Sequence, residues 1–377
     1  MKKKILIIYA SYGNGHKAIG KYIEKYFLKE NKDLEIKCID LMDYAMPLIG
    51  KISQKVNSFF MLKTPIIHDL FYKSSNTVVG GYLADYISTT LFKNKRMRKA
   101  LMDFNPDLTI ATHFFGSSLI SHYNKKGLIN SKLVTVVTDY ESCELWLNDY
   151  KCDDYLIVGD KSEVHSLVKR GIAKKKIKAL GIPIAPYVDN NFNKTSFLKK
   201  LGIKGDKLVC VFFGGGGNGS TTSIPYIKRL MKNRLDLDII FIAGNNKKSK
   251  EMVDNYIQEN NITNVHTLGF ATNVPELLQA CDFVISKPGG AQSTECLYFH
   301  KPIMMINASG GQEIANYKFF TKNGYGMRFR TSFGLTRGVK NIVNNPESLK
   351  KMALNMAKGD NHDAMAKLYE LCKDLLK

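Results

Sequence analysis

Short apolar segments rich in Val and Ile alternate along this chain with amphipathic stretches of helical length. The apolar segments are continuously hydrophobic, which is typical of parallel strands covered by helices on both faces. They fall into two sets, which predict two doubly wound α/β domains. The strands predicted for the first set are Lys4–Ala10, Leu34–Ile39, Leu108–Thr112, Leu133–Val137 and Tyr155–Val158. Those predicted for the second set are Leu208–Phe213, Asp238–Ala243, Val265–Leu268, Phe283–Ser286 and Ile303–Ile306.

The composition changes near residue 185, which marks a domain boundary. Two prolines and a glycine lie in Gly181–Tyr187, and a polar stretch follows, as expected for a linker. We therefore expect an N-terminal domain over residues 1–185, a C-terminal domain over 186–350, and a C-terminal helix over 351–377 that could pack back on the first domain. A length of 377 residues agrees with two domains.

The composition favours a reducing compartment. The seven cysteines are scattered, none forms a CxxC pair, and no His/Cys cluster has zinc spacing, so the protein is expected to be cytoplasmic with reduced thiols. Met1 and three lysines precede a short apolar run, which predicts a buried strand rather than a signal peptide. Because no window of 18 apolar residues exists, no membrane-spanning helix is expected.

The net charge of +21 favours nucleic acid or an anionic membrane surface, although a lysine-rich solvated surface would give the same charge. Residues 44–92 are apolar and aromatic, include Phe59 and Phe60, and lead directly into a cationic cluster. Apolar area beside positive charge suits an interfacial membrane contact. Core helices of the first domain are the plainer interpretation, and both can hold. The cationic cluster consists of Lys93, Lys95, Arg96, Arg98 and Lys99.

A glycine-rich turn, Ser11-Tyr-Gly-Asn-Gly-His16, follows the first predicted strand and opens a helix. It is not the GxGxxG dinucleotide fingerprint, because no third glycine follows in register. Gly15 lets the backbone approach a ligand, and His16 falls in the first helical turn, where the helix dipole favours the neutral imidazole. A neutral imidazole at the mouth of a cleft suits general-base work, and a capping or packing histidine is the alternative.

Asp139 and Trp146, the single tryptophan, follow the strand Leu133–Val137. The carboxyl ends of parallel strands point into the ligand crevice of such domains, so Asp139 could orient His16 or hold an acceptor hydroxyl. A helix N-cap is the alternative role for Asp139. His113, at the end of the preceding strand, is a second candidate for the same crevice.

Residues 286–316 predict a donor site. A strand ends at Ser286, a Lys-Pro-Gly-Gly turn follows, and a helix begins at once, which offers free N–H groups and a positive dipole end to a phosphate. Glu295 follows about one and a half turns later, where its carboxylate could accept both hydroxyls of a ribose. The side chains of Gln312 and Glu313 could bind a sugar that is attached to the nucleotide. The segment therefore predicts a nucleotide-sugar site.

Glycine-rich turns after two other strands extend this site. The glycines of Gly214–Gly219 have no side chains to cover the backbone N–H groups, which can therefore bind an anion. Ala243–Asn246 is a similar exposed turn. A flexible loop is the alternative for the first turn, and Phe270 could either stack on a uracil or pack in the core. The candidate donor contacts in these turns are Gly215, Gly216, Asn218, Gly244 and Asn245.

No metal ion or cofactor is expected. The chain has no Walker lysine motif and no Asp-x-Asp pair in a cleft position. The helix dipole and backbone donors would then meet the charge of a leaving diphosphate.

These motifs together resemble glycosyltransferase family 28, in the branch of processive diacylglycerol glycosyltransferases and plant-type monogalactosyldiacylglycerol synthases. The resemblance covers most of the chain, and the combination of motifs is specific although each one alone is not. Two positions depart from the branch: Cys143 stands where a histidine is usual, and Ala291-Gln292 replaces an apolar residue and a threonine. The matching segments are Gly13–His16, Val137–Asp139 with Trp146, Gly181–Pro183, Lys287–Gly290 with Glu295, and Gly311–Glu313 with Asn316.

The resemblance implies a GT-B fold, in which two Rossmann-like domains face a central cleft. The second domain would bind most of a UDP-sugar and the first domain the acceptor. His16 would deprotonate the glycerol hydroxyl of diacylglycerol, and the anomeric carbon would be inverted without metal. Residues 44–99, with Gly15 and Trp146, would form the acceptor and membrane region. The donor contacts would be Gly289, Gly290, Ala291, Gln292, Glu295, Gln312, Glu313 and Asn316.

The sequence thus predicts a peripheral enzyme on the inner face of the cell membrane that moves glucose or galactose from a UDP-sugar to diacylglycerol. Successive additions of sugar are left open, and no nucleic-acid partner is expected. One alternative is transfer of N-acetylglucosamine to a lipid-linked cell-wall precursor, which the Thr-Asp…Trp segment and the Lys-Pro-Gly-Gly form disfavour. Another is a non-catalytic UDP-sugar sensor that binds nucleic acid, against which the presence of His16 and Glu295 speaks.

Overall fold

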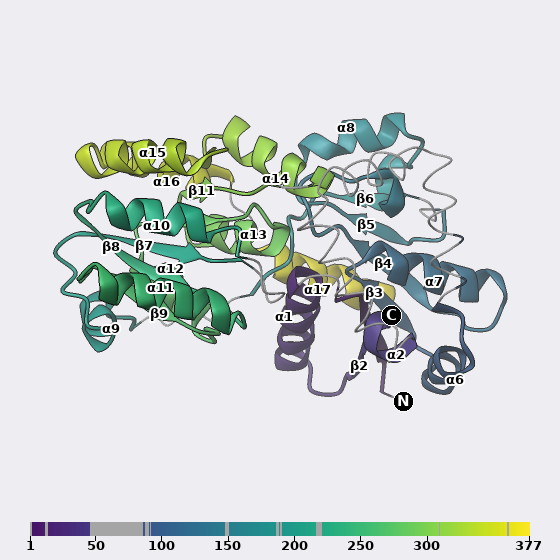
Figure 1. Ribbon diagram of the computed structural model, residues 1–377. Coiled ribbons are helices and arrows are strands. Elements are labelled where there is room, and N and C mark those ends of the chain that lie inside the picture. Colours follow the sequence, from purple (N-terminus) through teal and green to yellow (C-terminus); the bar gives the residue numbers. More distant parts are fainter. Residues whose placement is uncertain are drawn as a thin grey trace. The chain divides into compact units, whose positions relative to one another are not determined.

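The computed structural model divides into two compact units (Figure 1). The first unit comprises Met1–Ala185, Gly310–Ala315 and Asn361–Lys377, and the second comprises Pro186–Ser309 and Asn316–Asp360. The described residues are 2–11, 14–45 (side chains as far as 43), 86, 90, 92–147, 151–185, 188, 191–215, 221–308, 310–359 and 362–377.

The first unit is built on one six-stranded parallel sheet. Its strands are β1 (Lys4–Tyr9), β2 (Glu35–Asp40), β3 (Leu108–Ala111), β4 (Lys132–Val136), β5 (Tyr155–Ile157) and β6 (Ile177–Lys178). They are arranged in the order β2-β1-β3-β4-β5-β6, and all neighbouring pairs are parallel. From β1 the chain passes first to β2 on one side and then to β3 on the other. The order therefore reverses between β1 and β3, where sheets of this kind form a ligand crevice at the carboxyl ends of the strands.

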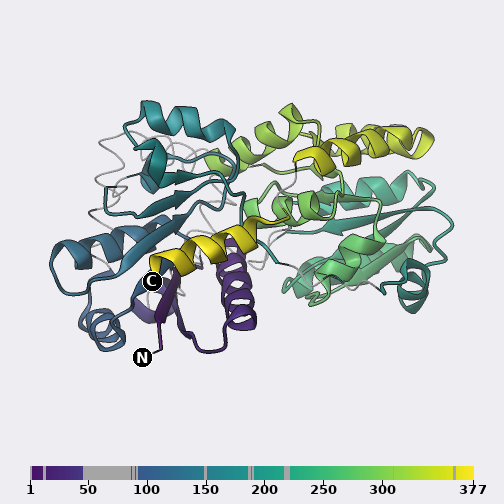
Figure 2. The ribbon, with the colours of Figure 1, turned by 180° about the vertical axis from the view of Figure 1, so that it is seen from behind.

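Helices pack on this sheet through apolar side chains. In the described residues they are α1 (Asn14–Glu30), α2 (Leu41–Ala45), α6 (Lys95–Phe104), α7 (Phe114–Lys125), α8 (Ser162–Lys169) and α17 (Ala364–Leu375), with short 3-10 helices η1 (Glu144–Trp146) and η2 (Lys174–Lys176). α1 buries Ile19, Ile23 and Phe27, spaced four residues apart on one face. At the end of the chain α17 lies beside α1, and the ring of Tyr369 meets that of Phe27 edge-on with 5.1 Å between centroids (Figure 2).

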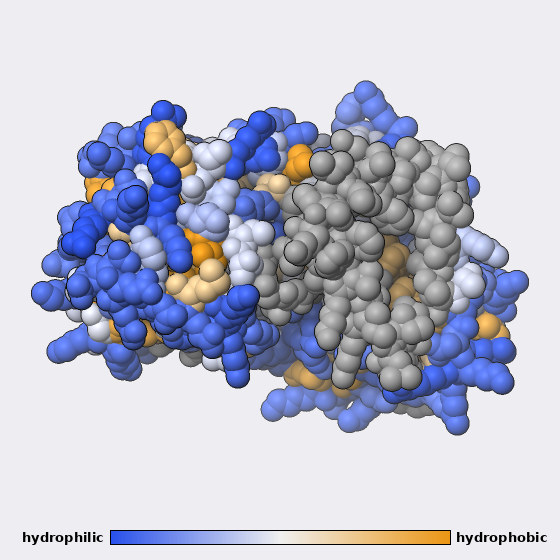
Figure 3. Space-filling model, viewed as in Figure 1, coloured by the Kyte–Doolittle hydropathy of each residue, from blue (hydrophilic) through white to orange (hydrophobic). Residues whose placement is uncertain are grey.

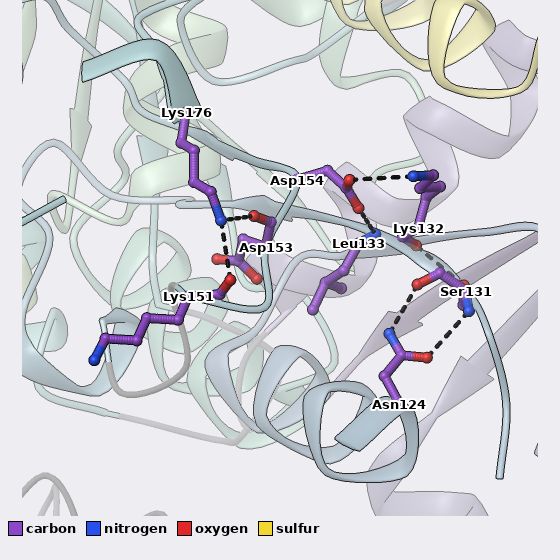
Figure 4. Close-up of polar contacts among 8 residues, drawn as sticks. All are labelled: Asn124, Ser131, Lys132, Leu133, Lys151, Asp153, Asp154 and Lys176. Atoms are coloured by element: carbon purple, nitrogen blue, oxygen red, sulfur yellow. Dashed lines mark hydrogen bonds and ion pairs between the residues drawn. The ribbon is translucent and has the colours of Figure 1, made fainter. Parts of the chain in front are cut away.

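Polar side chains hold the amino-terminal edge of this sheet (Figure 4). The Asp154 carboxylate accepts a hydrogen bond from the Leu133 nitrogen at 2.8 Å, and the Asn124 side chain bonds both backbone groups of Ser131 at 2.8 and 3.0 Å. The Lys176 ammonium donates to two carbonyls of the loop before β5 at 2.7 and 2.9 Å. These bonds fix the strand starts, at the edge opposite to the crevice.

The second unit repeats this plan. Its strands are β7 (Leu208–Phe213), β8 (Leu237–Ile242), β9 (Val265–Leu268), β10 (Phe283–Ser286), β11 (Ile303–Met305) and β12 (Gly326–Arg328). The order is β12-β11-β10-β7-β8-β9, again with all pairs parallel. Phe212, Phe241 and Phe283 are fully buried in its core. Here the order reverses between β7 and β10, so the crevice lies at the carboxyl ends of those two strands.

The helices of the second unit cover both faces of its sheet (Figure 1), and the face seen in Figure 3 is mostly hydrophilic. They are α9 (Lys194–Lys200), α10 (Ile224–Lys232), α11 (Lys247–Glu259), α12 (Val274–Ala280), α13 (Gly290–Tyr298), α14 (Gly310–Lys322), α15 (Ser332–Asn344) and α16 (Glu347–Gly359). The first six residues of α14 group with the first unit. No helix in the described part of the chain is long and apolar enough to cross a membrane.

All ten strands predicted from the sequence are present. The sequence did not predict β6 and β12, because these are edge strands of two and three residues and both contain a basic residue. The segment predicted as one C-terminal helix, residues 351–377, contains the end of α16 and the whole of α17.

Candidate active site

His16 lies in the first turn of α1, soon after the carboxyl end of β1. Its Nδ1 atom is 2.8 Å from the carbonyl oxygen of Thr112, which follows β3, and 2.8 Å from Oγ1 of Thr138, which follows β4. The Thr112 hydroxyl donates in return to the His16 carbonyl at 2.9 Å. The histidine is thus anchored where the strand order of the first sheet reverses, the place predicted for it.

The contact with Thr112 determines which nitrogen of His16 carries the proton. A backbone carbonyl accepts hydrogen bonds and cannot donate them, so Nδ1–H is the donor. The Thr138 hydroxyl oxygen, at the same distance from Nδ1, shares that hydrogen as a second acceptor. Nε2 therefore keeps its lone pair. A neutral imidazole with a basic Nε2 is the form that a general base requires.

Burial keeps both histidines of this region neutral. It lowers the pKa of His16 from the ordinary 6.5, while the Asp139 carboxylate and the hydrogen bond to Thr112 offset part of the shift. The pKa of His113 is lowered well below 6.5, first by burial and then by the neighbouring His16. His113 Nδ1 accepts from the Phe115 nitrogen at 3.2 Å and so caps α7. His113 thus has an observed structural role at the start of a helix.

Asp139 and Trp146 lie in the segment that follows β4, and the fold brings both close to His16. Asp139 is buried, and its charge acts on the imidazole through space. The Trp146 ring packs edge-on against Phe114 at 5.6 Å between centroids, and it is 6.4 Å from the His16 ring. The Trp146 indole nitrogen has no hydrogen-bond partner among the residues that the structure describes. Gly15 precedes the histidine and is half-buried.

In the second unit, the turn between β10 and α13 has the geometry of an anion site. β10 ends at Ser286, and α13 begins at Gly290 with Gly289 as its N-cap and no side-chain capping bond. Apart from Gly289 itself and its two chain neighbours, no described residue has an atom within 4 Å of the point where a side chain at Gly289 would begin. The first-turn amides and the positive end of the helix dipole therefore have room for a phosphate.

Polar side chains surround this turn. Asn316 is fully buried, and its Nδ2 donates to the Pro288 carbonyl at 3.0 Å. Ser293 Oγ and Gln292 Nε2 are buried without a hydrogen-bond partner in the described part of the protein. Buried polar atoms without partners are costly. Two such atoms, on consecutive residues in the first turn of α13, are what a polar ligand at that end of the helix would satisfy.

The other predicted donor contacts follow neighbouring strands of the same sheet. Gly215 follows β7, Gly244 and Asn245 follow β8, and Phe270 follows β9, so all lie at the same edge as the α13 turn. The Phe270 side chain is 64% exposed, which excludes core packing and leaves it able to stack on a base. Two further predicted contacts, Gly216 and Asn218, lie outside the described residues.

Three residues that were predicted to bind the ribose and the sugar lie on helices. Glu295 is half-buried in the second turn of α13. Gln312 and Glu313 are half-buried in the first turn of α14, the helix that also carries Asn316. Within the described residues, no group of three or more His, Cys, Asp or Glu side chains could hold a metal ion.

The cationic cluster predicted for membrane contact lies on and before α6. This helix is amphipathic: it buries Met97, Leu101 and Phe104, and its N-cap Asn94 accepts from the Met97 nitrogen at 2.9 Å. All five cations of the cluster are exposed, namely Lys93, Lys95, Arg96, Arg98 and Lys99. Phe59 and Phe60, like most of residues 44–92, lie outside the described residues.

Two parallel Rossmann-like sheets, each with polar groups at its switch point, define a GT-B fold. A co-structure of S. aureus MnaA with UDP matches with a TM-score of 0.63 at 14% identity, over 97% of this chain and 94% of that chain. The crystal structure of Acinetobacter baumannii MurG matches with a TM-score of 0.59 at 10% identity, over 99% of each chain. At these identities the likeness concerns the fold alone.

The family follows from sequence comparison. Residues 16–184 match the family model of monogalactosyldiacylglycerol (MGDG) synthase, and residues 209–368 match the glycosyltransferase family 28 C-terminal domain. A processive diacylglycerol beta-glucosyltransferase of Staphylococcus saprophyticus is 29% identical over 378 residues, which is 99% of this chain and 92% of that protein. One from Bacillus pumilus is 26% identical over 94% of this chain and 90% of that protein. The chain belongs to glycosyltransferase family 28, in the branch that its motifs predicted.

Sequence reasoning missed several groups that build the two sites. It did not assign the Thr112 carbonyl or the Thr138 hydroxyl to the histidine, and it did not single out Ser293. The position of Thr138 directly after a strand, and of Ser293 in the first turn after a Pro-Gly-Gly turn, would have been usable signals. A backbone carbonyl such as that of Thr112 leaves no signal in the residue type.

Proposed function

We propose that this protein transfers a hexose, glucose or galactose, from a UDP-sugar to diacylglycerol at a membrane surface. The observation that carries the proposal is the fixed tautomer of His16 at the switch point of the first sheet. The names of the relatives, processive diacylglycerol beta-glucosyltransferases, support diacylglycerol as the acceptor. Structures of the same fold solved with UDP, such as S. aureus MnaA and Anabaena Alr3699/HepE, support a UDP-sugar donor.

On the acceptor side, His16 Nε2 takes the proton of the lipid hydroxyl while the hydroxyl oxygen bonds to the anomeric carbon of the sugar. The bond from that carbon to the diphosphate breaks, and UDP leaves with the electron pair. Attack opposite to the leaving group inverts the configuration. The Asp139 charge stabilises the imidazolium that forms, as its upward effect on the pKa of His16 indicates.

On the donor side, the diphosphate lies against the first-turn amides of α13 with Gly289, Gly290, Ala291 and Gln292. Backbone donors and the helix dipole stabilise the leaving UDP in place of a metal ion. The Glu295 carboxylate accepts from the ribose hydroxyls, and Phe270 stacks on the uracil. Gln312 and Glu313 bind the hydroxyls of the sugar. The open space beside Gly289 and the buried donors of Gln292 and Ser293 support this arrangement.

The exposed cations of α6 support attachment to the cytoplasmic face of an anionic membrane. Each Lys or Arg near such a surface contributes about 1 kcal/mol of attraction. A second basic run, residues 169–178, is partly engaged in the fold. Three of its six cations, Lys169, Lys174 and Lys175, are exposed, and the other three make contacts within the protein. Within it Arg170 pairs with Glu144 at 2.6 Å, Lys176 donates to two backbone carbonyls, and Lys178 lies 4.9 Å from the centre of the Tyr155 ring. We therefore assign the membrane contact to α6 and the residues before it.

A substrate panel tests the proposal. Purified protein is incubated with radiolabelled UDP-glucose, UDP-galactose or UDP-N-acetylglucosamine and with anionic vesicles that contain diacylglycerol. We expect a labelled glycolipid from one of the hexoses, and none from vesicles without diacylglycerol. Absence of glycolipid with every donor, or transfer of N-acetylglucosamine to another lipid instead, would contradict the proposal. A ladder of larger glycolipids would establish successive transfer.

A further inference from the structure

A buried carboxylate lies outside the two sites described above. Glu163, in the first turn of α8, is only 8% exposed. Its Oε2 atom accepts two hydrogen bonds from Ser142, from the backbone nitrogen at 2.7 Å and from Oγ at 2.6 Å. Glutamate is rarely buried to this extent unless it is paired, so this contact accounts for the position of the side chain.

Arg170, at the C-terminal end of α8, binds the same segment. Its guanidinium donates to the carbonyl oxygen of Ser142 at 2.8 Å and forms an ion pair with Glu144 Oε1 at 2.6 Å. Both backbone polar groups of Ser142 are therefore bound by side chains at the two ends of one helix. Charge-assisted hydrogen bonds of this length are the stronger kind.

Apolar packing holds the segment as well. Cys143, which stands where the family usually has a histidine, is 4% exposed and packs in a core cluster with Val137 and Trp146. That cluster includes Leu167 of α8. The helix therefore holds the segment between Asp139 and Trp146 through both polar and apolar contacts.

We propose that Glu163 and Arg170 are positioning residues for the acceptor half of the active site. By fixing Ser142 they determine where Asp139 and Trp146 lie against the catalytic histidine. Neither residue touches a reacting atom. The kinetic consequence of this inference rests on the proposed function, whereas its structural consequence does not.

The structural consequence is measured by fluorescence, because Trp146 is the only tryptophan in the chain. At pH 8, above the pKa of about 7 to which burial raises the Glu163 carboxyl, Glu163→Gln removes the charge that binds Ser142 at nearly constant volume. We expect the emission to move to longer wavelength and quenching by acrylamide to increase. Arg170→Lys should change the spectrum in the same direction. Lysine lacks the planar guanidinium whose N–H groups bind Ser142 and Glu144 at the same time. Glu251→Gln, at an exposed position on α11 in the second unit, removes the same charge away from Ser142; it is the matched control and should leave the spectrum unchanged.

The kinetic consequence separates positioning from a purely structural role. At pH 8, where Glu163 is ionised, loss of one charge-assisted bond should lower kcat about tenfold. The KM for the UDP-sugar should stay unchanged, because the donor turn lies in the second unit. Wild-type fluorescence and kcat in both folded variants would overturn the inference. If the wild-type protein makes no glycolipid, the proposed function fails, and the fluorescence of the variants still decides whether α8 positions Trp146.

Discussion

The Oγ1 atom of Thr138 lies 2.8 Å from Nδ1 of His16, although the two residues are 122 positions apart in the chain. Together with the Thr112 carbonyl, this hydroxyl surrounds the one imidazole nitrogen that carries a proton. The Thr-Asp pair after β4 thus acts on the histidine through both members: the threonine by contact with Nδ1, and Asp139 by its charge. The threonine orients the general base, and the charge of Asp139 polarises it.

Replacing Thr138 with valine removes the hydroxyl and nearly keeps the shape of the side chain. Because a typical hydrogen bond contributes about 0.5–1.5 kcal/mol, we expect kcat to fall roughly two- to tenfold. The KM for the UDP-sugar should not change. Steady-state kinetics measures both values, with Thr321→Val on the exposed face of α14 as the control. An unchanged kcat would show that the hydroxyl does not hold the imidazole in its active orientation.

The pH dependence of transfer should report the lowered pKa of His16. The base works only when unprotonated, so kcat/KM should decline on the acid side with an apparent pKa below 6.5. In Asp139→Asn the charge that raises this pKa is lost, so the acid limb should move to still lower pH. The plateau should drop as well, because the imidazolium loses its stabilising partner. Profiles that shift toward higher pH would contradict this arrangement of charges.

Asn316 should matter for donor binding although it need not touch the nucleotide through its side-chain amide. Its Nδ2 holds the Pro288 carbonyl in the turn that leads into α13. In Asn316→Ala that buried carbonyl loses its partner, so the turn is no longer held in the shape that receives the phosphate. The lost bond is worth about 1–3 kcal/mol, and to the extent that UDP binding must restore the shape of the turn, the Kd for UDP rises by up to roughly 5- to 150-fold. Calorimetric titration with UDP measures this change. Asn323→Ala, at an exposed position just after α14, should bind UDP normally. Equal affinities for the two variants would refute a role of Asn316 in shaping the phosphate site.

Glu163 should make stability depend on pH. Burial, with smaller contributions from Glu141 and Asp160, raises the pKa of its carboxyl from 4.5 to about 7, against the lowering effect of the Ser142 bonds. The folded protein therefore holds the proton more tightly than the unfolded chain does. The stabilising effect of that proton is complete below pH 4.5 and is lost as the pH rises to about 7.

The Glu163→Gln variant lacks this titration. Its stability relative to the wild type should rise by about 2–3 kcal/mol between pH 5 and pH 8, whatever the offset between the two proteins at pH 5. Urea unfolding of both proteins at the two pH values measures the difference between their free energies of unfolding. The contributions of other titrating groups are the same in both proteins and cancel in that difference. A difference that stays constant with pH would mean that Glu163 titrates at its ordinary pKa.

Much of the fold could be predicted because its strands are short, apolar and buried on both faces. Continuous runs such as those of β1 and β10 have few other interpretations. The edge strands β6 and β12 escaped prediction because they are short and mixed in polarity. The same regularity made the candidate site predictable, since residues directly after strands meet at one edge of a parallel sheet.

The rest of the site depends on contacts that residue types do not reveal. The Thr112 carbonyl is a backbone group, and every residue offers one. Glu163 lies on a short helix with charged neighbours, where a glutamate is normally solvated, and its partner Ser142 is 21 positions away. Only the path of the chain after β5 brings the two together. For Phe270, by contrast, the sequence allowed either stacking on a base or packing in the core. Its exposed side chain excludes core packing.

The most direct test of the central claim compares His16→Ala with the wild type in two measurements on the same preparations: glycolipid formed from a UDP-hexose and diacylglycerol vesicles, and affinity for UDP. If His16 is the base, glycolipid formation falls by about 10²–10⁴-fold while UDP binds as in the wild type. A His16→Ala protein that makes glycolipid at the wild-type rate would contradict the account.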